Sequence, residues 1–478
     1  MTEKPFIHLL RWHRHYYFFD VNRNQLLKVT KELYEELERE QKGAQERHTR
    51  AYEELKELGF LSSNKIQVME HPQTEAAEEL VNHELNQLTL QVTQDCNFRC
   101  SYCIYSDINN EGQRHHEKRF MDFQTAKKAV DYFYRCSDRA ERLSIGFYGG
   151  EPLLNFPLMQ QVVEYAEPLL AGRHCQFTIT TNASLLTEKV QDFLVKHDFS
   201  LAVSLDGPEK IQNINRRFAA NGKGSYQTVM HNLMSLKTRY PEWFEKRAGL
   251  SMVIDPRNDY DEILPVFQIF GKQAGINAVT ISDAYSLQKT YFTEDFLWKQ
   301  RYHQFLTLVE SYRGEETDGV SREARQMIAS LKKDKIQYLP VQHLAERQVP
   351  GGPCIPGQTK LFVTVAGDFY PCERVSESSP CMKIGNLENG IDIKQVKGMM
   401  NFSRETQEIC RSCWAVLHCD QCLRHVENHR SMSGKARLRF CETTRKKVED
   451  TLLDFAAFQE FRKMGGQHCG KTDNGISL

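Results

Sequence analysis

Three cysteines at close spacing constrain this chain more than any other feature of its sequence. Cys96, Cys100 and Cys103 follow the apolar-rich run 88–93, which predicts a strand, so they lie on the loop leaving its carboxyl end. Three thiolates with the spacing CX3CX2C can bind three irons of a cubane cluster and leave the fourth iron open to another ligand. The alternatives are unrelated buried thiols or a zinc site, and a structural zinc site needs a fourth protein ligand.

The other cysteines point to a second metal-bearing region. The chain has 14 cysteines, none before Cys96 and eight from Cys354 to Cys441. The N-terminus lacks a signal-peptide pattern and no apolar run approaches the ~20 residues of a membrane span, so we expect a cytoplasmic protein without a membrane partner. Cysteines in that compartment serve metal or redox chemistry more often than disulfides. A net charge of −1 gives no support for binding nucleic acid.

The first 80 residues predict a small separate module. Aromatic-rich runs at 7–12 and 15–21, and a third run at 25–29, predict three short strands. Thr30 is a suitable N-cap for a charged helix that extends to about Leu58 and is interrupted near Gly43, and 60–68 is expected to be a further strand or wing. This order suggests a winged-helix-like fold, but residues 31–58 carry nine acidic and six basic side chains, which argues against DNA binding. The polar stretch 70–84 is predicted to be a linker.

From residue 85 the pattern alternates between strands and helices. Such alternation predicts an α/β fold with a parallel sheet, either doubly wound or curled into a partial barrel, with ligands at the carboxyl ends of the strands. The expected strands are 87–93, 143–148, 175–181, 200–205, 249–254 and 277–282, and the expected helices are 122–136, 157–171, 187–197, 225–239 and 259–273.

Polar motifs follow the second, third and fourth of these strands. Gly149 and Gly150 allow close approach of a ligand to the backbone, and Glu151 can accept a hydrogen bond from an ammonium group. Asn182, Ser204 and Asp206 follow at the next two strand ends, where each alone is more often a turn residue than a ligand. Together with the cysteine loop, these motifs resemble the radical S-adenosylmethionine (radical SAM) enzymes. The resemblance implies that SAM contacts Tyr102, Gly149, Gly150, Glu151, Asn182, Ser204, Asp206 and Arg216, with Arg217 as the alternative to Arg216.

The C-terminal cysteines have a spacing of their own. Cys354, Gly367 and Cys372 form CX12GX4C, with a hairpin expected around Gly367, and Cys410, Cys413, Cys419, Cys422 and Cys441 follow. Zinc is the alternative for the CX2C pairs. The order resembles the SPASM extension of radical SAM enzymes, although the family ends in CX5CX3C and this chain in CX5CX2C. The resemblance assigns Cys354, Cys372 and Cys422 to auxiliary cluster I, and Cys410, Cys413, Cys419 and Cys441 to auxiliary cluster II.

The first auxiliary set has only three members. It either keeps an open iron or is closed by Cys381, while Cys136 and Cys175 are expected to be buried thiols and Cys469 lies in a C-terminal tail. The N-terminal module resembles leader-peptide recognition modules, which add an extended peptide to a sheet edge; the alternative is a capping subdomain without a ligand. We therefore expect five parts: a recognition module (1–80), a partial (β/α)6 radical SAM barrel (85–300), a helical bridge (301–349), a SPASM domain (350–450), and a C-terminal helix and tail (451–478).

The resemblance as a whole is to ranthipeptide and sactipeptide synthases. It implies a peptide maturase with three [4Fe–4S] clusters and S-adenosylmethionine, which forms Cys thioether crosslinks through a 5′-deoxyadenosyl radical. We favour the side-chain (non-α, ranthipeptide) linkage, with a leader-bearing, cysteine-containing precursor peptide as substrate and flavodoxin or ferredoxin as reductant. The alternatives are α-carbon thioethers, carbon–carbon crosslinking, epimerisation, sulfatase maturation, and a non-enzymatic peptide-binding protein. No catalytic acid or base is expected beyond the cluster and SAM ligands.

Overall fold

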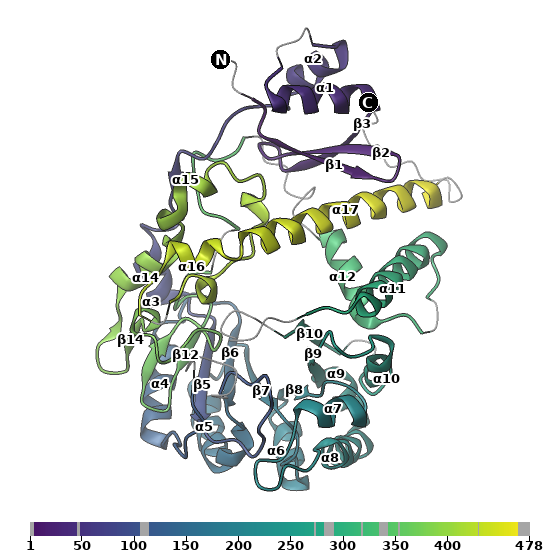
Figure 1. The fold of residues 1–478 in the computed structure, drawn as a ribbon. Helices are drawn as coiled ribbons and strands as arrows, with labels where there is room; N and C mark the ends of the chain where they lie inside the picture. Colours follow the sequence, from purple (N-terminus) through teal and green to yellow (C-terminus); the bar gives the residue numbers. More distant parts are fainter. Residues whose placement is uncertain are drawn as a thin grey trace.

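An N-terminal sheet, a long C-terminal helix and a larger sheet covered by helices make up this protein (Figure 1). No helix among the described residues is long and apolar enough to cross a membrane. The computed structural model describes residues 4–44, 48–105, 114–271, 274–281, 291–316, 319–333, 343–351, 354–428 and 430–466.

The N-terminal module is an antiparallel three-stranded sheet with two helices. Its strands are β1 (Ile7–Trp12), β2 (His15–Asp20) and β3 (Gln25–Val29), paired in the order β1-β2-β3. The helices α1 (Lys31–Lys42) and α2 (Arg50–Glu57) lie on the side of the sheet away from the rest of the molecule (Figure 1).

Local capping produces the predicted break in the helix. Thr30 accepts a hydrogen bond from the Leu33 N–H at 3.3 Å and starts α1, and Gly43, with φ of 96°, ends it. Two expectations for the following residues are wrong. The extra strand, β4 (Val68–Met69), pairs with β11 (Arg347–Gln348) outside the three-stranded sheet, so it is not a wing. The expected linker contains α3 (Ala77–His83), which forms because Ala77 and Val81 are fully buried in the main core and Leu80 packs against it.

The larger sheet has ten strands. Its parallel part runs in chain order from β10 to β5, without the reversal of order that a doubly wound sheet shows, so the partial barrel is the correct alternative. All six predicted strands are present, with ends shifted by at most two residues. They are β5 (Gln87–Thr93), β6 (Leu143–Gly149), β7 (Cys175–Thr181), β8 (Ser200–Ser204), β9 (Ala248–Ile254) and β10 (Ile276–Thr280).

Helices cover the outer face of these strands (Figure 1). The predicted helix over 259–273 is reduced to the short α10 and a 3-10 turn, and α7 and α9 were not predicted because their sequences are only two turns long. The helices are α4 (Phe123–Arg135), α5 (Phe156–Leu169), α6 (Glu188–Lys196), α7 (Glu209–Asn215), α8 (Tyr226–Arg239), α9 (Pro241–Arg247) and α10 (Leu264–Phe267).

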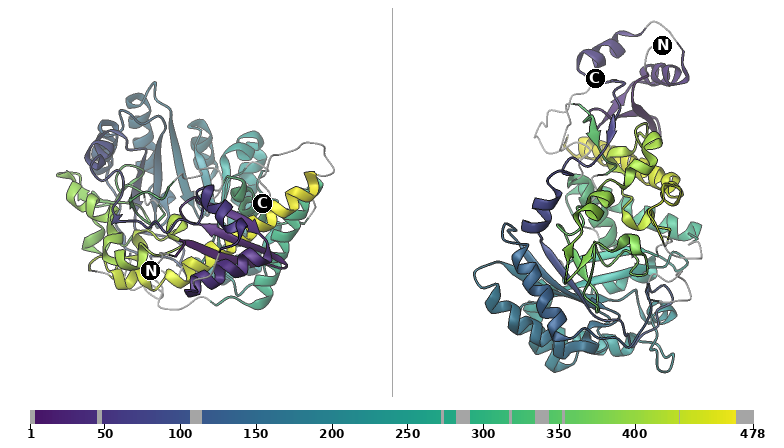
Figure 2. Two further views of the ribbon diagram at one scale, coloured as in Figure 1. Left: turned by 90° about the horizontal axis from the view of Figure 1, so that it is seen from above. Right: turned by 90° about the vertical axis from the view of Figure 1, so that its left-hand side faces the viewer.

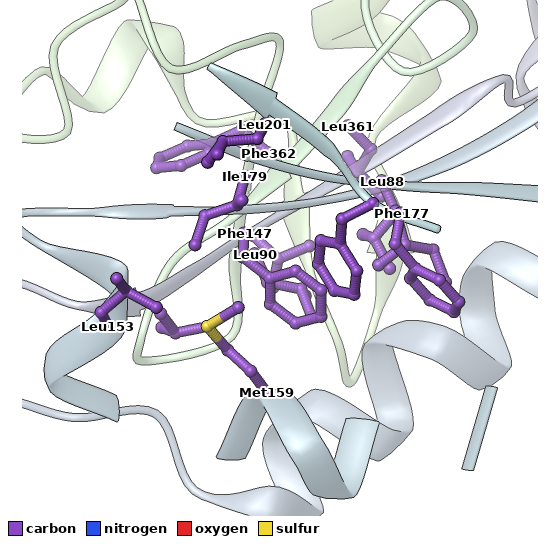
Figure 3. Close-up of a cluster of buried hydrophobic side chains, with 14 of the residues drawn as sticks. Leu88, Leu90, Phe147, Leu153, Met159, Phe177, Ile179, Leu201, Leu361 and Phe362 are labelled. Carbon is purple, nitrogen blue, oxygen red and sulfur yellow. The ribbon is translucent and has the colours of Figure 1, made fainter. Parts of the chain in front are cut away.

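The core lies between the sheet and these helices. Leu90, Phe147 and Ile179, from three neighbouring strands, stand between the sheet and Met159 of α5 (Figure 3). The same buried cluster continues into Leu361 and Phe362 of the C-terminal region, so the two regions share one core.

The cysteine-rich C-terminal region extends the sheet. β12 (Leu361–Val363) pairs parallel with β5 and antiparallel with β13 (Asp368–Tyr370), and Gly367, with φ of 83°, forms the predicted hairpin turn. The remaining strands are β14 (Gly385–Asn386) and β15 (Gly390–Ile391). The remaining helices are α11 (Glu294–Arg313), α12 (Arg322–Lys333), α14 (Ile393–Met400), α15 (Gln407–Cys410), α16 (Gly434–Leu438) and α17 (Cys441–Gly466). The 3-10 turns are η1 (Pro152–Asn155), η2 (Asp261–Ile263), η3 (Pro380–Met382), η4 (Phe402–Thr406), η5 (Val416–His418) and η6 (Leu423–His425).

Helix α17 connects the two ends of the molecule. It passes beneath the N-terminal sheet and beside α11 (Figures 1 and 2). Tyr17 of β2 donates a hydrogen bond to Glu460 at 3.1 Å, and Lys28 of β3 pairs with the same carboxylate at 2.9 Å. Because α17 begins at Cys441, one helix links the cysteine-rich region to the N-terminal sheet.

Candidate iron–sulfur and SAM site

The three cysteines at the end of β5 lie in a loop shaped by its own backbone. The N–H of Phe98 donates to Cys96 Sγ at 3.4 Å, and the N–H of Tyr105 donates to Cys103 Sγ at 3.5 Å. Phe98 itself is buried against Phe218, in an isolated bridge between the loop and the segment after α7. The loop therefore presents its sulfurs from a backbone that is held on both sides.

The three sulfurs influence one another. Burial raises the pKa of Cys96 well above its usual range, and the negative charges of Glu151, Cys103 and Cys100 raise it further. Burial raises the pKa of Cys100 to about 12, although the Arg216 guanidinium opposes the rise. Buried thiols of this kind stay protonated until a metal replaces the proton, and such clustering suits one shared inorganic group.

The loop after β6 is wrapped onto the cysteine loop by its two glycines. Gly150 donates its N–H to the Thr93 carbonyl at 3.0 Å, and a Cβ there would overlap the Asp95 carbonyl and lie 3.0 Å from the Cβ of Cys96. Gly149 has φ of 146°, and a Cβ there would overlap the Thr93 carbonyl oxygen. Only glycine fits at either position.

Glu151 is buried and joins the ends of β6 and β7. Its carboxylate accepts hydrogen bonds from the hydroxyl of Thr181 at 2.6 Å, the N–H of Asn182 at 2.8 Å and the N–H of Leu153 at 3.1 Å. An ionised carboxylate has about four acceptor positions, so one is left for the expected SAM ammonium group. Burial raises the pKa of Glu151, and these hydrogen bonds oppose the rise.

Asn182 lies beside the cysteine loop, as its position after β7 predicts. Its amide donates to Asn97 Oδ1 at 2.9 Å, and its own Oδ1 accepts from Ser184. Ser204 is half-buried at the end of β8, beside Ser251 of β9. The structure thus brings the predicted residues of β7 and β8 to the same edge of the sheet.

Tyr102, Asp206 and Arg216 form one buried cluster. Asp206 accepts from the Tyr102 hydroxyl and from Arg216 Nε, the latter at 3.0 Å, and the Val253 N–H donates to its other oxygen at 3.1 Å. Arg216 Nη1 lies 4.0 Å from Cys100 Sγ. These side chains therefore satisfy one another and hold Cys100. Arg217, the alternative to Arg216, is exposed.

A further buried network stands beside Cys103. Glu377 accepts from Gln91 Nε2 at 2.5 Å and pairs with Arg114 at 2.5 Å, while Gln91 also donates to the Tyr105 hydroxyl at 3.0 Å. Arg114 is 2% exposed, and its guanidinium lies over the Phe362 ring at 4.7 Å. The sequence analysis missed this network because isolated arginine and glutamate residues give no local signal; the only hint was their closeness in the chain to cysteine motifs.

Comparison with known proteins identifies this part of the chain. Residues 90–289 match the family model of the radical SAM superfamily. Residues 90–289 are a radical SAM domain. The family implies one [4Fe–4S] cluster and S-adenosylmethionine, and the three clustered thiols at the end of β5 fit such a cluster.

Relatives extend the similarity beyond this domain. An uncharacterized protein of Methanocaldococcus jannaschii is 28% identical over 67% of this chain and 96% of its own length. The radical SAM cyclopropyl synthase TigE of Paramaledivibacter caminithermalis is 28% identical, and a cysteine-type anaerobic sulfatase-maturating enzyme of Clostridium novyi is 26% identical. The alignments span 38% and 40% of this chain, and only 40% and 48% of those two proteins.

A solved structure shares the fold. The structure of anSMEcpe with bound AdoMet and Cp18Cys peptide matches 80% of this chain and 99% of its own, with a TM-score of 0.56 and 17% identity. The similarity extends over a larger share of the chain than the radical SAM domain occupies, and it shows a common α/β architecture with a mixed sheet.

Three further sulfurs gather where the cysteine-rich region joins the radical SAM domain. Burial raises the pKa of Cys372 to about 11, and the charges of Glu373, Cys354 and Cys422 add to the rise. The negative charge of Cys422 also raises the pKa of Cys354. Cys381 has other neighbours. Its sulfur lies 3.2 Å from Ser379 Oγ, and the negative charge of Glu427 raises its pKa. The structure therefore brings together the three cysteines assigned to auxiliary cluster I.

The four cysteines assigned to auxiliary cluster II form another group. Burial raises the pKa of Cys413, and the charges of Cys410 and Cys441 add to the rise. Burial also raises the pKa of Cys419, and the charges of Cys413 and Cys410 add to it. Gln421 Nε2 donates to Cys441 Sγ at 3.7 Å. Cys441 starts α17, whose N-terminal dipole favours a negative charge.

Within the described residues, no three His, Cys, Asp or Glu side chains are arranged to hold one metal ion. A cubane cluster requires a different spacing, because each thiolate binds a different iron. The sulfur donors and their grouping fit clusters at both C-terminal sites, although Cys354 is exposed and only Cys410 among them is buried. Cys136 is a buried thiol as predicted, Cys175 is half-buried, and Cys469 lies outside the described residues.

Proposed function

We propose that this chain is a radical SAM peptide maturase that joins a cysteine sulfur to a side-chain carbon in a ribosomally made precursor peptide. The observation that carries the proposal is the group of three sulfurs, Cys354, Cys372 and Cys422, beside the radical SAM domain. A cluster held by three thiolates keeps one iron without a protein ligand. A substrate thiolate is a suitable ligand for that iron.

The chemistry needs a source of radicals and an electron acceptor. When bound, a cluster at Cys96, Cys100 and Cys103 with SAM supplies a 5′-deoxyadenosyl radical that removes hydrogen from an unactivated C–H bond. In the crosslink, the substrate carbon would lose a hydrogen atom to the 5′-deoxyadenosyl radical, the thiol would lose a proton, and one electron would pass to a cluster held by the auxiliary cysteines as the C–S bond forms. The peptide therefore loses two hydrogens for each crosslink.

The chain's own residues would bind SAM, orient the substrate and exclude water. Glu151 and Asn182 hold the strand ends around the cysteine loop. Arg216, which is paired with Asp206, contacts Cys100. The Gln91–Glu377–Arg114 network holds polar side chains in fixed positions, so it would help to orient the substrate.

The N-terminal module is the proposed site for a leader peptide. Among the described residues, strand β3 pairs with β2 alone, so its second edge is where an extended peptide can add. The proposed substrate is therefore a peptide with a leader that binds this edge and a cysteine-containing core that enters the radical SAM domain. A flavodoxin or ferredoxin would supply the electron.

The test is to search beside the gene for a reading frame that encodes a small cysteine-containing peptide, and to co-express any such peptide with this chain. A mass loss of two hydrogens per crosslink, with fragmentation placing the sulfur on a β or γ carbon, supports the proposal. Attachment at the α carbon would replace it with the sactipeptide type. An unchanged mass, or a mass loss that fragmentation traces to a carbon–carbon bond, overturns the thioether reaction.

Iron content tests the cofactor set. Three cubanes predict about 12 iron atoms per chain, and Cys372→Ala should remove about four of them. Cys381→Ala is the matched control and should keep the full iron content and the activity. If Cys381→Ala instead loses a cluster, the first auxiliary set has four protein ligands and no open iron.

Sulfatase maturation is the second candidate, because the relatives include sulfatase-maturating enzymes and the shared fold covers 80% of the chain. A peptide with a sulfatase-type cysteine would then lose its sulfur and gain an aldehyde. An aldehyde reagent distinguishes this product from a thioether.

A further inference from the structure

Three arginines are buried among the described residues, and one of them lacks a carboxylate partner. Arg114 pairs with Glu377 and Arg216 pairs with Asp206. Arg437, which is 2% exposed and among the largest fully buried side chains, takes part in no ion pair with a carboxylate within the described part of the chain. A buried cation without an anion is costly, so Arg437 needs a negative group of another kind.

That group is sulfur. Arg437 Nη1 lies 3.1 Å from Cys410 Sγ and also donates to Thr406 Oγ1. Thr406 Oγ1 lies 3.3 Å from Cys410 Sγ and 3.3 Å from the Ser403 carbonyl oxygen, so its O–H faces two acceptors. A charged donor therefore points at this sulfur, and the Thr406 hydroxyl lies beside it.

The packing keeps the guanidinium in place. Arg437 is on α16, whose first turn is capped by Ser433 and where a Cβ at Gly434 would lie 2.9 Å from the Glu405 carbonyl of η4. Its charged end lies 5.0 Å from the centre of the buried Phe402 ring. The side chain is thus fixed between the turn that carries Thr406 and the cysteine group.

The guanidinium also has a donor left over. Its Nε is buried and has no hydrogen-bond partner within the described residues. The positive charge of Arg437 opposes the rise in the pKa of Cys419, and its guanidinium contacts Cys410 Sγ. The charge of Arg437 therefore reaches two of the four sulfurs. An unused N–H beside several sulfurs suits an inorganic sulfide, which accepts hydrogen bonds, and the reduction potential of a cluster depends on such bonds and on nearby charge.

We propose that Arg437 is a positioning residue for the cluster at Cys410, Cys413, Cys419 and Cys441, where it balances the negative charge and raises the reduction potential. The proposal rests on the assignment of a cluster to these cysteines. It explains a buried cation that has no carboxylate partner within the described part of the chain.

The test is an anaerobic redox titration of the full chain, followed by electron paramagnetic resonance. Replacing Cys96, Cys100 and Cys103 by alanine leaves two auxiliary signals, and a further Cys372→Ala leaves the one assigned to this cluster. In that background Arg437→Met should shift the midpoint potential to a lower value, and Arg437→Lys should shift it less. Arg439→Met is the matched control, since Arg439 is exposed two residues away, and it should leave the potential unchanged.

An unchanged potential in Arg437→Met, with full iron content, overturns the proposal. If Arg437→Met loses the cluster, Arg437→Lys decides: retention of the cluster supports the charge-balancing role, and loss of the cluster there too overturns it in favour of a role in packing. The iron count of the unmodified chain separates this inference from the proposed function. Zinc at these four cysteines would refute the cluster assignment itself, whereas a failed crosslinking assay would leave the potential shift interpretable.

Discussion

His8 and Trp414 stack face to face, with ring centroids 3.6 Å apart and ring planes within 2° of parallel. His8 is on the first strand of the N-terminal sheet, and Trp414 directly follows Cys413. Near it, His418 Nε2 lies 2.7 Å from Asn24 Oδ1. The N-terminal sheet therefore docks on the loop that carries the second auxiliary group of cysteines, so occupancy of that group and order in the sheet are physically connected.

Trp414→Ala should loosen the N-terminal sheet. The change removes the stack on His8 and part of a buried cluster, a loss of about 2 kcal/mol. Faster amide hydrogen exchange in β1 and β2, measured by mass spectrometry, is the expected result. Trp298→Ala is the control, because Trp298 is 77% exposed on α11 and should not alter exchange in the sheet. Equal exchange in both variants would contradict the docking role.

Acidification should weaken the same contact. Burial lowers the pKa of His8 to about 4, below its value of about 6.5 in an unfolded chain. The unfolded state then binds more protons, so stability is lost as the pH falls from about 6.5 towards 4, by up to about 3 kcal/mol. His8→Phe keeps the stack but cannot titrate, so its melting temperature should depend less on pH in this range. Part of the dependence should remain, since burial also lowers the pKa of His425 to about 4. Identical pH profiles for the two chains would show that His8 does not carry the effect.

The strands of the radical SAM domain were predictable because each is a short apolar run between turn residues. The pairing of β12 with β5 was not, because it joins segments about 270 residues apart and depends on which sheet edge the fold leaves free. Helix α3 escaped prediction for a similar reason: only its burial in the core gives a polar-looking stretch an apolar face.

The candidate site divides in the same way. The grouping of the C-terminal cysteines came from the resemblance to the SPASM extension. Local spacing does not give it, because Cys422 lies with Cys354 and Cys372 although Cys419 is its neighbour in the chain. Asp206 and Arg216 were predicted as separate contacts of SAM, but they bind each other, because a sequence does not tell whether two opposite charges face a ligand or one another. Arg437 gave no signal, because only the fold shows that it is buried against sulfur.

Asp206→Ala should destabilise the radical SAM domain strongly. It leaves the Arg216 charge buried without a partner, which costs about 3–5 kcal/mol. We expect a clear fall in the midpoint of thermal unfolding, together with loss of iron from the first cysteine loop. Glu79→Ala is the control: it breaks the Glu79–Arg139 pair, whose side chains are 63% and 52% exposed, and should lower the midpoint only slightly. A similar fall in both variants would mean that the buried pair does not support the loop.

Gly150→Ala should separate the cysteine loop from the loop after β6. The added Cβ would overlap the Asp95 carbonyl oxygen and crowd the Cβ of Cys96, and neither the backbone nor the cysteine can move without displacing the first sulfur group. The expected result is loss of about four irons per chain and of 5′-deoxyadenosine formation under reductant, with the auxiliary irons retained. Gly275→Ala is the control, because a Cβ at Gly275 meets nothing within 4 Å, and it should retain both the iron and the activity. If Gly150→Ala still forms 5′-deoxyadenosine at the rate of the control, close contact between the two loops is not required for radical generation.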